Sequence, residues 1–120
     1  MRTDRIAALS QLANLQKAAD LARLAQISAR LQSTQALHDQ TEDALSRQTD
    51  LATRSPEPPV WQVLDAHAIL AQQVLTLLAA EIDRIGAERG DQRQICARSF
   101  GRAQMLDRIY DDQPRRSRNA

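Results

Sequence analysis

The sequence predicts an all-α fold in which two long helices form an antiparallel coiled-coil hairpin. The composition favours helices, because Ala, Leu and Gln dominate while only three aromatic residues and three glycines occur. A compact globular core normally uses more large aromatic side chains. Apolar residues recur with heptad spacing in both halves of the chain. Three of the four prolines lie near the middle, where they interrupt this pattern once.

The first helix is expected over residues of about 4–53. Thr3 and Asp4 are both good N-cap residues, and neither Pro nor Gly occurs before the break. Steps of about 100° per residue place one apolar stripe along this helix, and from Leu24 onward its steps alternate between three and four residues. The stripe contains Ile6, Leu9, Ala13, Leu24, Ile27, Leu31, Thr34, His38, Thr41, Leu45 and Gln48, and a second apolar line beside it contains Leu37, Ala44 and Leu51.

The second helix is expected over residues of about 60–112, after a turn at about 54–59. Asp111, Asp112 and Pro114 are expected to end it, which gives a single hairpin over residues 1–113. The basic tail 114–120 is expected to be disordered. The three-four spacing of the second helix predicts a seam of Leu64, Ala68, Ala71, Leu75, Leu78, Ile82, Ile85, Arg89, Gln92, Cys96, Ser99, Ala103, Leu106 and Tyr110.

Neither predicted helix can bury its own apolar stripe. The short connection holds the other helix at a high effective concentration, which favours a hairpin. A bent chain that dimerises through each stripe is the alternative. The part of the second helix between Gly86 and Gly101 is expected to pack more loosely, because each glycine in a helix costs about 1 kcal/mol relative to Ala.

Charge and cysteine content narrow the classes of function. Sixteen basic against fifteen acidic residues argue against a dedicated nucleic-acid or membrane-surface protein. Weak nucleic-acid binding through the basic tail is an alternative. The single cysteine cannot form an internal disulfide. The N-terminus does not resemble a signal peptide, and the longest apolar run, interrupted by Gln72 and Gln73, is judged too short to span a bilayer. A cytoplasmic protein is therefore expected.

The sequence contains no recognisable catalytic or metal-binding motif. His38 and His67 have Asp39 and Asp65 beside or near them, but a tetrahedral metal site needs three or four convergent ligands. Cys96 has arginines nearby, which can lower a thiol pKa, yet catalysis would also need a base and an oxyanion pocket. We therefore expect no enzymatic activity, no metal and no cofactor.

Trp61 follows the proline-rich break and has two interpretations. It can close the end of the seam as a structural residue. Alternatively it can anchor a partner protein, because Trp is enriched among binding hot spots. The apolar residues around the turn exceed what one seam can cover, and this excess keeps both interpretations open.

These features resemble the flagellar FliJ family and the YscO-like stalk proteins of type III secretion. The resemblance covers nearly the whole chain. It is carried by a leucine-rich first helix, a mid-chain break, the segment "VWQVLDAHAILAQQVLTLLAAEIDRI" and the C-terminal "ARSFGRAQMLDRIYDDQ". It implies an antiparallel coiled-coil hairpin without enzymatic activity.

The resemblance also implies two partner-binding surfaces. The helix ends would enter the ring of the export ATPase, through Arg5, Leu9, Arg102, Leu106 and Arg108. The flank would contact the cytoplasmic domain of the export gate, through Trp61, His67, Ala71, Val74, Leu78, Leu37, Thr41 and Ala44. This sequence lacks the aromatic residue that the family often carries where His67 stands, and it lacks the tyrosines of the facing helix.

The expected function is that of a stalk or adaptor subunit of a flagellar or virulence type III export apparatus. It would couple the export ATPase to the export gate and also escort secretion chaperones. Contact with the membrane would be through its partners only, and no binding of nucleic acid is expected. The alternative is a generic coiled-coil binding module or chaperone that acts on another protein.

Overall fold

The computed structural model is entirely helical. It describes the backbone of residues 2–54 and 58–119, and the side chains of residues 3–54 and 62–112. Helix α1 spans Arg2–Arg54 and helix α2 spans Pro58–Asn119. The predicted all-α class with two long helices is confirmed.

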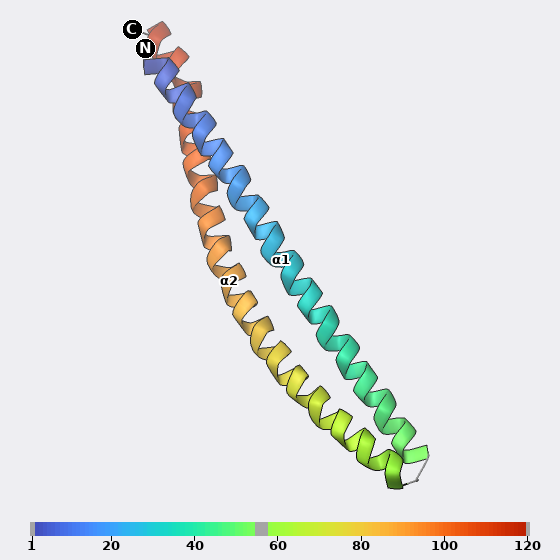
Figure 1. Cartoon of the computed structure of the whole chain (residues 1–120). Helices are drawn as coiled ribbons and strands as arrows, with labels where there is room; N and C mark the ends of the chain where they lie inside the picture. Colours follow the sequence, from blue (N-terminus) through green and yellow to red (C-terminus); the bar gives the residue numbers. More distant parts are fainter. Residues whose placement is uncertain (1, 55–57, 120) are drawn as a thin grey trace. The chain divides into compact units, whose positions relative to one another are not determined.

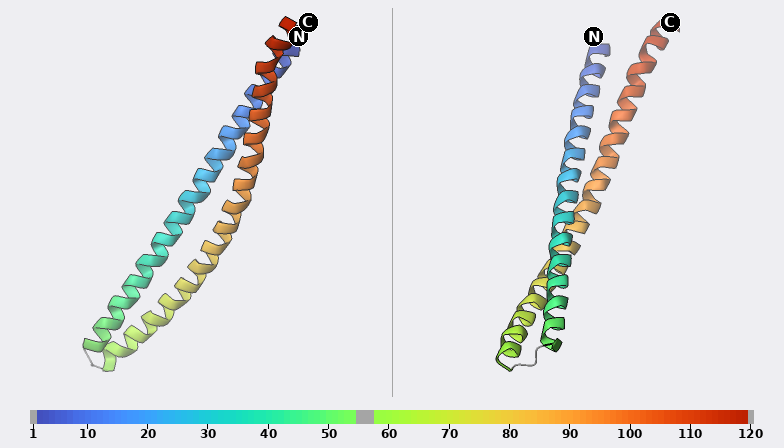
Figure 2. Two further views of the ribbon diagram at one scale, coloured as in Figure 1. Left: turned by 180° about the vertical axis from the view of Figure 1, so that it is seen from behind. Right: turned by 90° about the vertical axis from the view of Figure 1, so that its right-hand side faces the viewer.

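The chain divides into two units, each built from one part of α1 and one part of α2. Unit 1 comprises Met1–Ser28 with Glu88–Ala120, and unit 2 comprises Ala29–Ala87. Within each unit the two helices run side by side in opposite directions (Figures 1 and 2). The contacts of unit 1 show this antiparallel order, because Ser10 hydrogen-bonds to Asp107 while Arg23 pairs with Glu88. Both units therefore have the hairpin packing that the sequence predicts.

The seam of unit 2 has the predicted three-four spacing in both helices. Leu31 and Ile85 are buried, whereas the other seam side chains are only half-buried. The hydroxyl groups of the seam residues Thr34 and Thr41 donate to backbone carbonyls four residues earlier in α1, so they need no partner from α2. The half-buried seam residues are Thr34, His38, Thr41, Leu45, Gln48 and Ala52 of α1 and Leu64, Ala68, Ala71, Leu75, Leu78 and Ile82 of α2.

The seam of unit 1 differs from the prediction in α1. Leu9 was expected in the stripe, but 51% of its surface is exposed. The three-four spacing instead continues backward from Leu24 without interruption, through polar as well as apolar residues. A helix that supercoils around its partner keeps one register. The polar seam side chains find partners on α2, because Ser10 and Asp20 hydrogen-bond to Asp107 and Ser99 and the Lys17 ammonium lies over the Phe100 ring. The observed α1 seam of unit 1 is Ile6, Ser10, Ala13, Lys17, Asp20, Leu24 and Ile27.

The glycine-containing part of α2 is also the best buried, contrary to the expectation of looser packing. Cys96 and Ser99 are 6% and 5% exposed. Their small side chains let α2 pack closely against α1. A Cβ placed on any of the three glycines would meet no atom within 4 Å, so the glycines face open space and do not weaken the seam.

The C-terminal end of α2 extends beyond the predicted boundary. The backbone is helical to Asn119, whereas an end at about residue 112 was expected. Tyr110, the last predicted seam residue, is 41% exposed and lies outside the core. Residues 114–119 of the basic tail are therefore helical in the backbone and not disordered as expected, while the side chains of residues 113–120 lie outside the described part of the chain.

Helix α2 is apolar over a longer stretch than the sequence analysis concluded. Between Gln62 and Asp112 it contains an 18-residue window with a mean hydropathy of 1.5, which is long and apolar enough to cross a membrane by these two criteria alone. None of that window is fully buried. A stretch this apolar also has more apolar surface than a single seam with α1 can cover.

Candidate partner-binding surface

Each helix has two sides that flank its seam, and the two sides differ in chemistry. We call the residues immediately before seam residues the g side, and those immediately after seam residues the e side. Arg23 and Glu88, both on the g side, approach each other to 3.9 Å in unit 1. In unit 2 the g-side charge of Arg30 acts on the g-side Glu81 of the other helix. The g sides of α1 and α2 therefore lie on the same flank of each unit.

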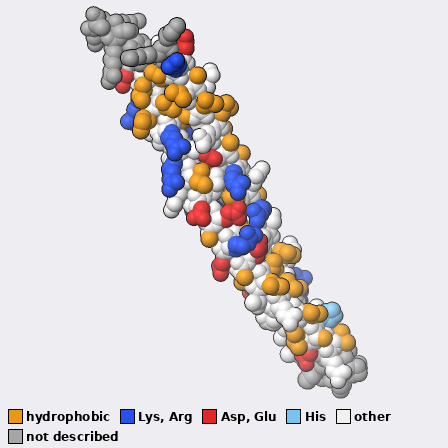
Figure 3. All heavy atoms as spheres, turned by 60° about the vertical axis from the view of Figure 1, so that its left-hand side comes forward, with side chains coloured by type: hydrophobic (Ala, Val, Ile, Leu, Met, Phe, Trp, Pro, Cys, Tyr) orange, Lys and Arg blue, Asp and Glu red, His pale blue; other side chains and the backbone are white. Residues whose placement is uncertain are grey.

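The g side of unit 2 exposes a row of large apolar side chains. A fully exposed side chain of this size presents roughly 100 Å² of apolar surface on the usual burial scale, so six side chains that are about half exposed leave roughly 300 Å² open. An apolar patch of this size on a monomer is often functional. Figure 3 shows hydrophobic side chains at the surface of both units on the face that it draws. The six are Leu37, Leu51, Val63, Leu70, Val74 and Leu77, which are 42–70% exposed.

The e side of unit 2 is mainly polar and acidic. Its hollow between the helices is lined by Glu42 and Thr49 of α1 and by Gln72 of α2. Ile69 is the exception, because it is exposed and apolar. The remaining e-side residues are Gln32, Gln35, Asp39, Ser46, Thr53, Asp65, Thr76, Ala79, Asp83 and Gly86.

All four arginines of unit 2 lie on the g side. Arg30, Arg47 and Arg84 immediately precede seam residues, and Arg54 follows Arg47 by one heptad. Glu81 is the one acidic residue among the described g-side positions of this unit. Arg84 Nε donates to Glu81 Oε2 at 3.0 Å. This hydrogen bond, more than the charges of the two arginines, holds the pKa of Glu81 below its ordinary value.

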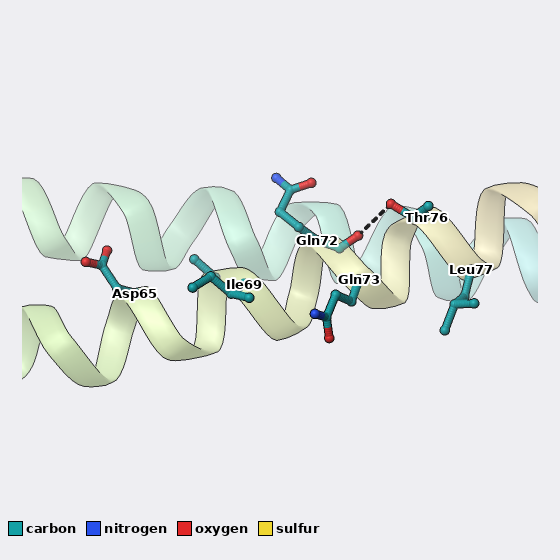
Figure 4. A pocket seen from close by; sticks show the side chains of 7 residues that line it. Asp65, Ile69, Gln72, Gln73, Thr76 and Leu77 are labelled. Atoms are coloured by element: carbon teal, nitrogen blue, oxygen red, sulfur yellow. Dashed lines mark hydrogen bonds between the residues drawn. The ribbon is translucent and has the colours of Figure 1, made fainter.

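Residues of α2 alone line a shallow depression around Ile69. Figure 4 shows Ile69 and Leu77 on α2, with Thr76 Oγ1 donating to the carbonyl oxygen of Gln72 at 2.9 Å. The depression contains no convergent polar groups of the kind that orient a small ligand. We therefore regard it as part of the open apolar surface of α2.

The residues implied for the export gate fall partly on the g side. Four of them, Leu37, Ala44, His67 and Val74, are exposed g-side residues of unit 2. The other three with described side chains, Thr41, Ala71 and Leu78, are half-buried in the seam. Seam packing leaves these three less surface for a partner. The Trp61 side chain lies outside the described residues, and its two interpretations stay open.

The residues implied for the ATPase lie in unit 1. Leu9, Arg102 and Leu106 line one shallow hollow together with Leu12 and Met105. Arg5 and Arg108 are exposed and are not among the lining residues of this hollow. The structure thus brings three of the five residues together at one surface.

A polar cluster joins the two helices in the middle of unit 1. The backbone carbonyl oxygen of Asp20 accepts hydrogen bonds from Gln92 Nε2 at 3.0 Å and from Cys96 Sγ at 3.3 Å. The Ser99 hydroxyl donates to the Asp20 carboxylate. Because these polar atoms have partners only in one alignment of the helices, the cluster fixes the register of unit 1.

His38 and Cys96 take part in local contacts within the hairpin. His38 lies in the seam as expected, with Nδ1 3.3 Å from Asp39 and 3.8 Å from Glu42. Among the described side chains no three His, Cys, Asp or Glu residues are placed to hold a metal ion. Cys96 is buried against Asp20, so its thiol is not presented to a substrate.

Several residues of the g side were not selected by sequence reasoning. Leu51 was recognised as part of a second apolar line but was not given a role, Val63 was counted only among the excess apolar residues around the turn, and Leu70 and Leu77 were not selected. Their signal was present, because Val63, Leu70 and Leu77 immediately precede predicted seam residues and Leu51 continues the seven-residue spacing of Leu37 and Ala44. Searches against protein-family models, curated proteins and solved structures find no match to this chain.

Proposed function

We propose that this chain is a non-enzymatic adaptor that binds another protein through the g side of unit 2. The observation that carries the proposal is the exposure of the apolar g-side residues along both helices of an antiparallel pair. A hairpin that needed only to bury its own seam would have polar residues at these positions, as it does at most e-side positions of unit 2.

The more specific proposal is a stalk of a type III export apparatus, and it depends on the resemblance to the FliJ and YscO-like families. Two features support it. The g side of unit 2 contains four of the residues implied for the export gate, and unit 1 gathers three of those implied for the ATPase. The stalk would couple the two partners without chemistry of its own.

The stalk proposal is tested by mixing the purified protein with the export ATPase of the same bacterium. We expect faster ATP hydrolysis and more complete ring assembly. An L9Q/L106Q variant should reduce both effects, because it alters the hollow of unit 1. No effect of the unaltered protein on hydrolysis or assembly would contradict the stalk proposal and leave only the general adaptor.

A further inference from the structure

Apolar residues at the flanking heptad positions of unit 2 indicate that its two helices can pack against a third helix from a partner. In a two-stranded coiled coil the apolar residues occupy the seam alone, whereas helices of a larger bundle are also apolar at a flanking position. Unit 2 is of the second kind. Leu37, Ala44 and Leu51 repeat every seven residues on α1, and Val63, Leu70 and Leu77 do so on α2.

The two g-side rows have the same length. Each covers two heptads, which is about 21 Å along a helix. A helix of about three heptads lying against both rows would cover them and complete a three-helix bundle. We infer that the partner of this surface is an amphipathic helix with acidic residues flanking its apolar stripe. This inference rests on the proposed adaptor function and names the chemistry of the partner.

Charge selects an acidic partner. The g side of unit 2 has four arginines and one glutamate, whereas the other six described acidic residues of the unit lie elsewhere. Arg47 and Arg54 lie beside the apolar rows, where the carboxylates of a bound helix would meet them. Charge complementarity of this kind orients a partner and raises its association rate.

The same charges disfavour a second copy of this chain as the occupant. Two g sides packed face to face would form a four-helix bundle, but would bring like-charged arginine clusters together. A partner helix with acidic flanks avoids this repulsion. A lipid surface is also less suitable, because the apolar rows follow heptads and match another helix.

The test uses the full-length protein and two synthetic peptides of about three heptads. Both peptides have Leu at the seam positions, one with Glu at all flanking positions and the other with Lys. We expect the Glu peptide to bind with an affinity that falls as salt is added, and the Lys peptide to bind at least about tenfold more weakly. Equal binding of the two peptides would overturn the inference.

Neighbouring residues provide a matched pair of variants. Leu70 on the g side and Ile69 on the e side are 58% and 61% exposed. L70Q should weaken binding of the Glu peptide by about tenfold, while I69Q should leave it unchanged. Because both side chains are largely exposed, both variants should retain the helical circular-dichroism spectrum of the unaltered protein. Equal losses in the two variants would place the binding surface elsewhere.

Charge reversal gives an independent readout. R47E/R54E should lose affinity for the Glu peptide and gain affinity for the Lys peptide. Self-association that L70Q abolishes would identify a second copy as the occupant and overturn the inference. Binding to phosphatidylglycerol vesicles with the same dependence on Leu70 and the arginines, without binding of the Glu peptide, would identify a lipid surface and overturn it too.

Failure of the inference can be distinguished from failure of the adaptor proposal. Suppose that a cognate export protein binds the unaltered chain but not L70Q, and that the Glu peptide does not displace it. This result would support the adaptor proposal and contradict the acidic partner helix. A cognate protein that binds L70Q as well as it binds the unaltered chain would reject the g side as the adaptor surface.

Discussion

Unit 1 fully buries polar side chains in its seam, whereas the polar seam side chains of unit 2 are only half-buried, and both units expose apolar side chains beside the seam. In unit 1, Gln92 and Ser99 are 3% and 5% exposed and both hydrogen-bond to Asp20. In unit 2, Leu70 and Leu77 are more than half exposed although the α2 seam residues beside them are apolar. Polar seam residues specify one alignment of two helices, while apolar residues outside a seam provide surface for a partner.

The largest expected effect is a loss of stability that compares the buried seam of unit 1 with the half-buried seam of unit 2. I27A removes a side chain that is 3% exposed and should lower the free energy of unfolding by about 2–5 kcal/mol. L75A, in the half-buried seam of unit 2, should cost less because part of Leu75 already contacts water. Urea unfolding measures both values. An equal or larger loss for L75A would break the distinction.

The next effect concerns the polar cluster of unit 1. D20A removes the acceptor of the buried Ser99 hydroxyl and should cost about 1–3 kcal/mol. Adding S99A to D20A should recover part of this loss, because the hydroxyl without a partner is then gone. Urea unfolding of the two single variants and the double variant completes a double-mutant cycle. Additive losses would show that this hydrogen bond does not couple the helices.

A smaller effect of opposite sign is expected at the glycines. G90A places a methyl group in open space on a helix and should raise the free energy of unfolding by about 0.5–1 kcal/mol. The reverse substitution A87G, at an exposed position nearby, serves as the control and should lower it by a similar amount. Thermal unfolding measures both changes. A loss of stability in G90A would mean that close packing, and not helix propensity, selects glycine at this position.

The smallest effect is expected at the ion pair of the g side. E81Q removes the charge that Arg84 stabilises, but both side chains are solvent-exposed and water screens their interaction. We expect its unfolding temperature to match that of E42Q, which removes an e-side charge. Stability assays should thus be insensitive to Glu81. A clear drop in E81Q alone would show that this pair contributes to the fold.

The sequence was sufficient to predict the fold class and most of the seam. Heptad spacing continues without interruption from Leu24 through the first helix and from Leu64 through the second, so the register followed directly. The N-terminal part of α1 was harder, because Leu9 and Leu12 compete with Ser10 and Ala13 for the seam. Hydrophobicity favours Leu9, but the uninterrupted register, with Asp20 meeting polar partners on α2, favours the seam that the structure contains.

The candidate surface could be predicted only in part. Leu37, Ala44 and Leu51 are visible in one helix as a line with a period of seven. Assigning them to the same flank as Val63 and Leu70 requires the relative alignment of the two helices, which a single helix does not encode. The grouping of arginines on that flank depends on the same alignment.

The central claim is that the exposed apolar residues of α1 and α2 in unit 2 form one face. Cross-linking with a short bis-maleimide tests it most directly, in a C96S background that leaves only the introduced thiols. The pair A44C/H67C joins two g-side positions in the register set by the Arg30 and Glu81 pair, and the control A44C/I69C joins a g-side to an e-side position at the same level. The hairpin predicts efficient intramolecular cross-linking of A44C/H67C and little of A44C/I69C. A higher yield for the control pair, or cross-links only between molecules, would contradict the claim.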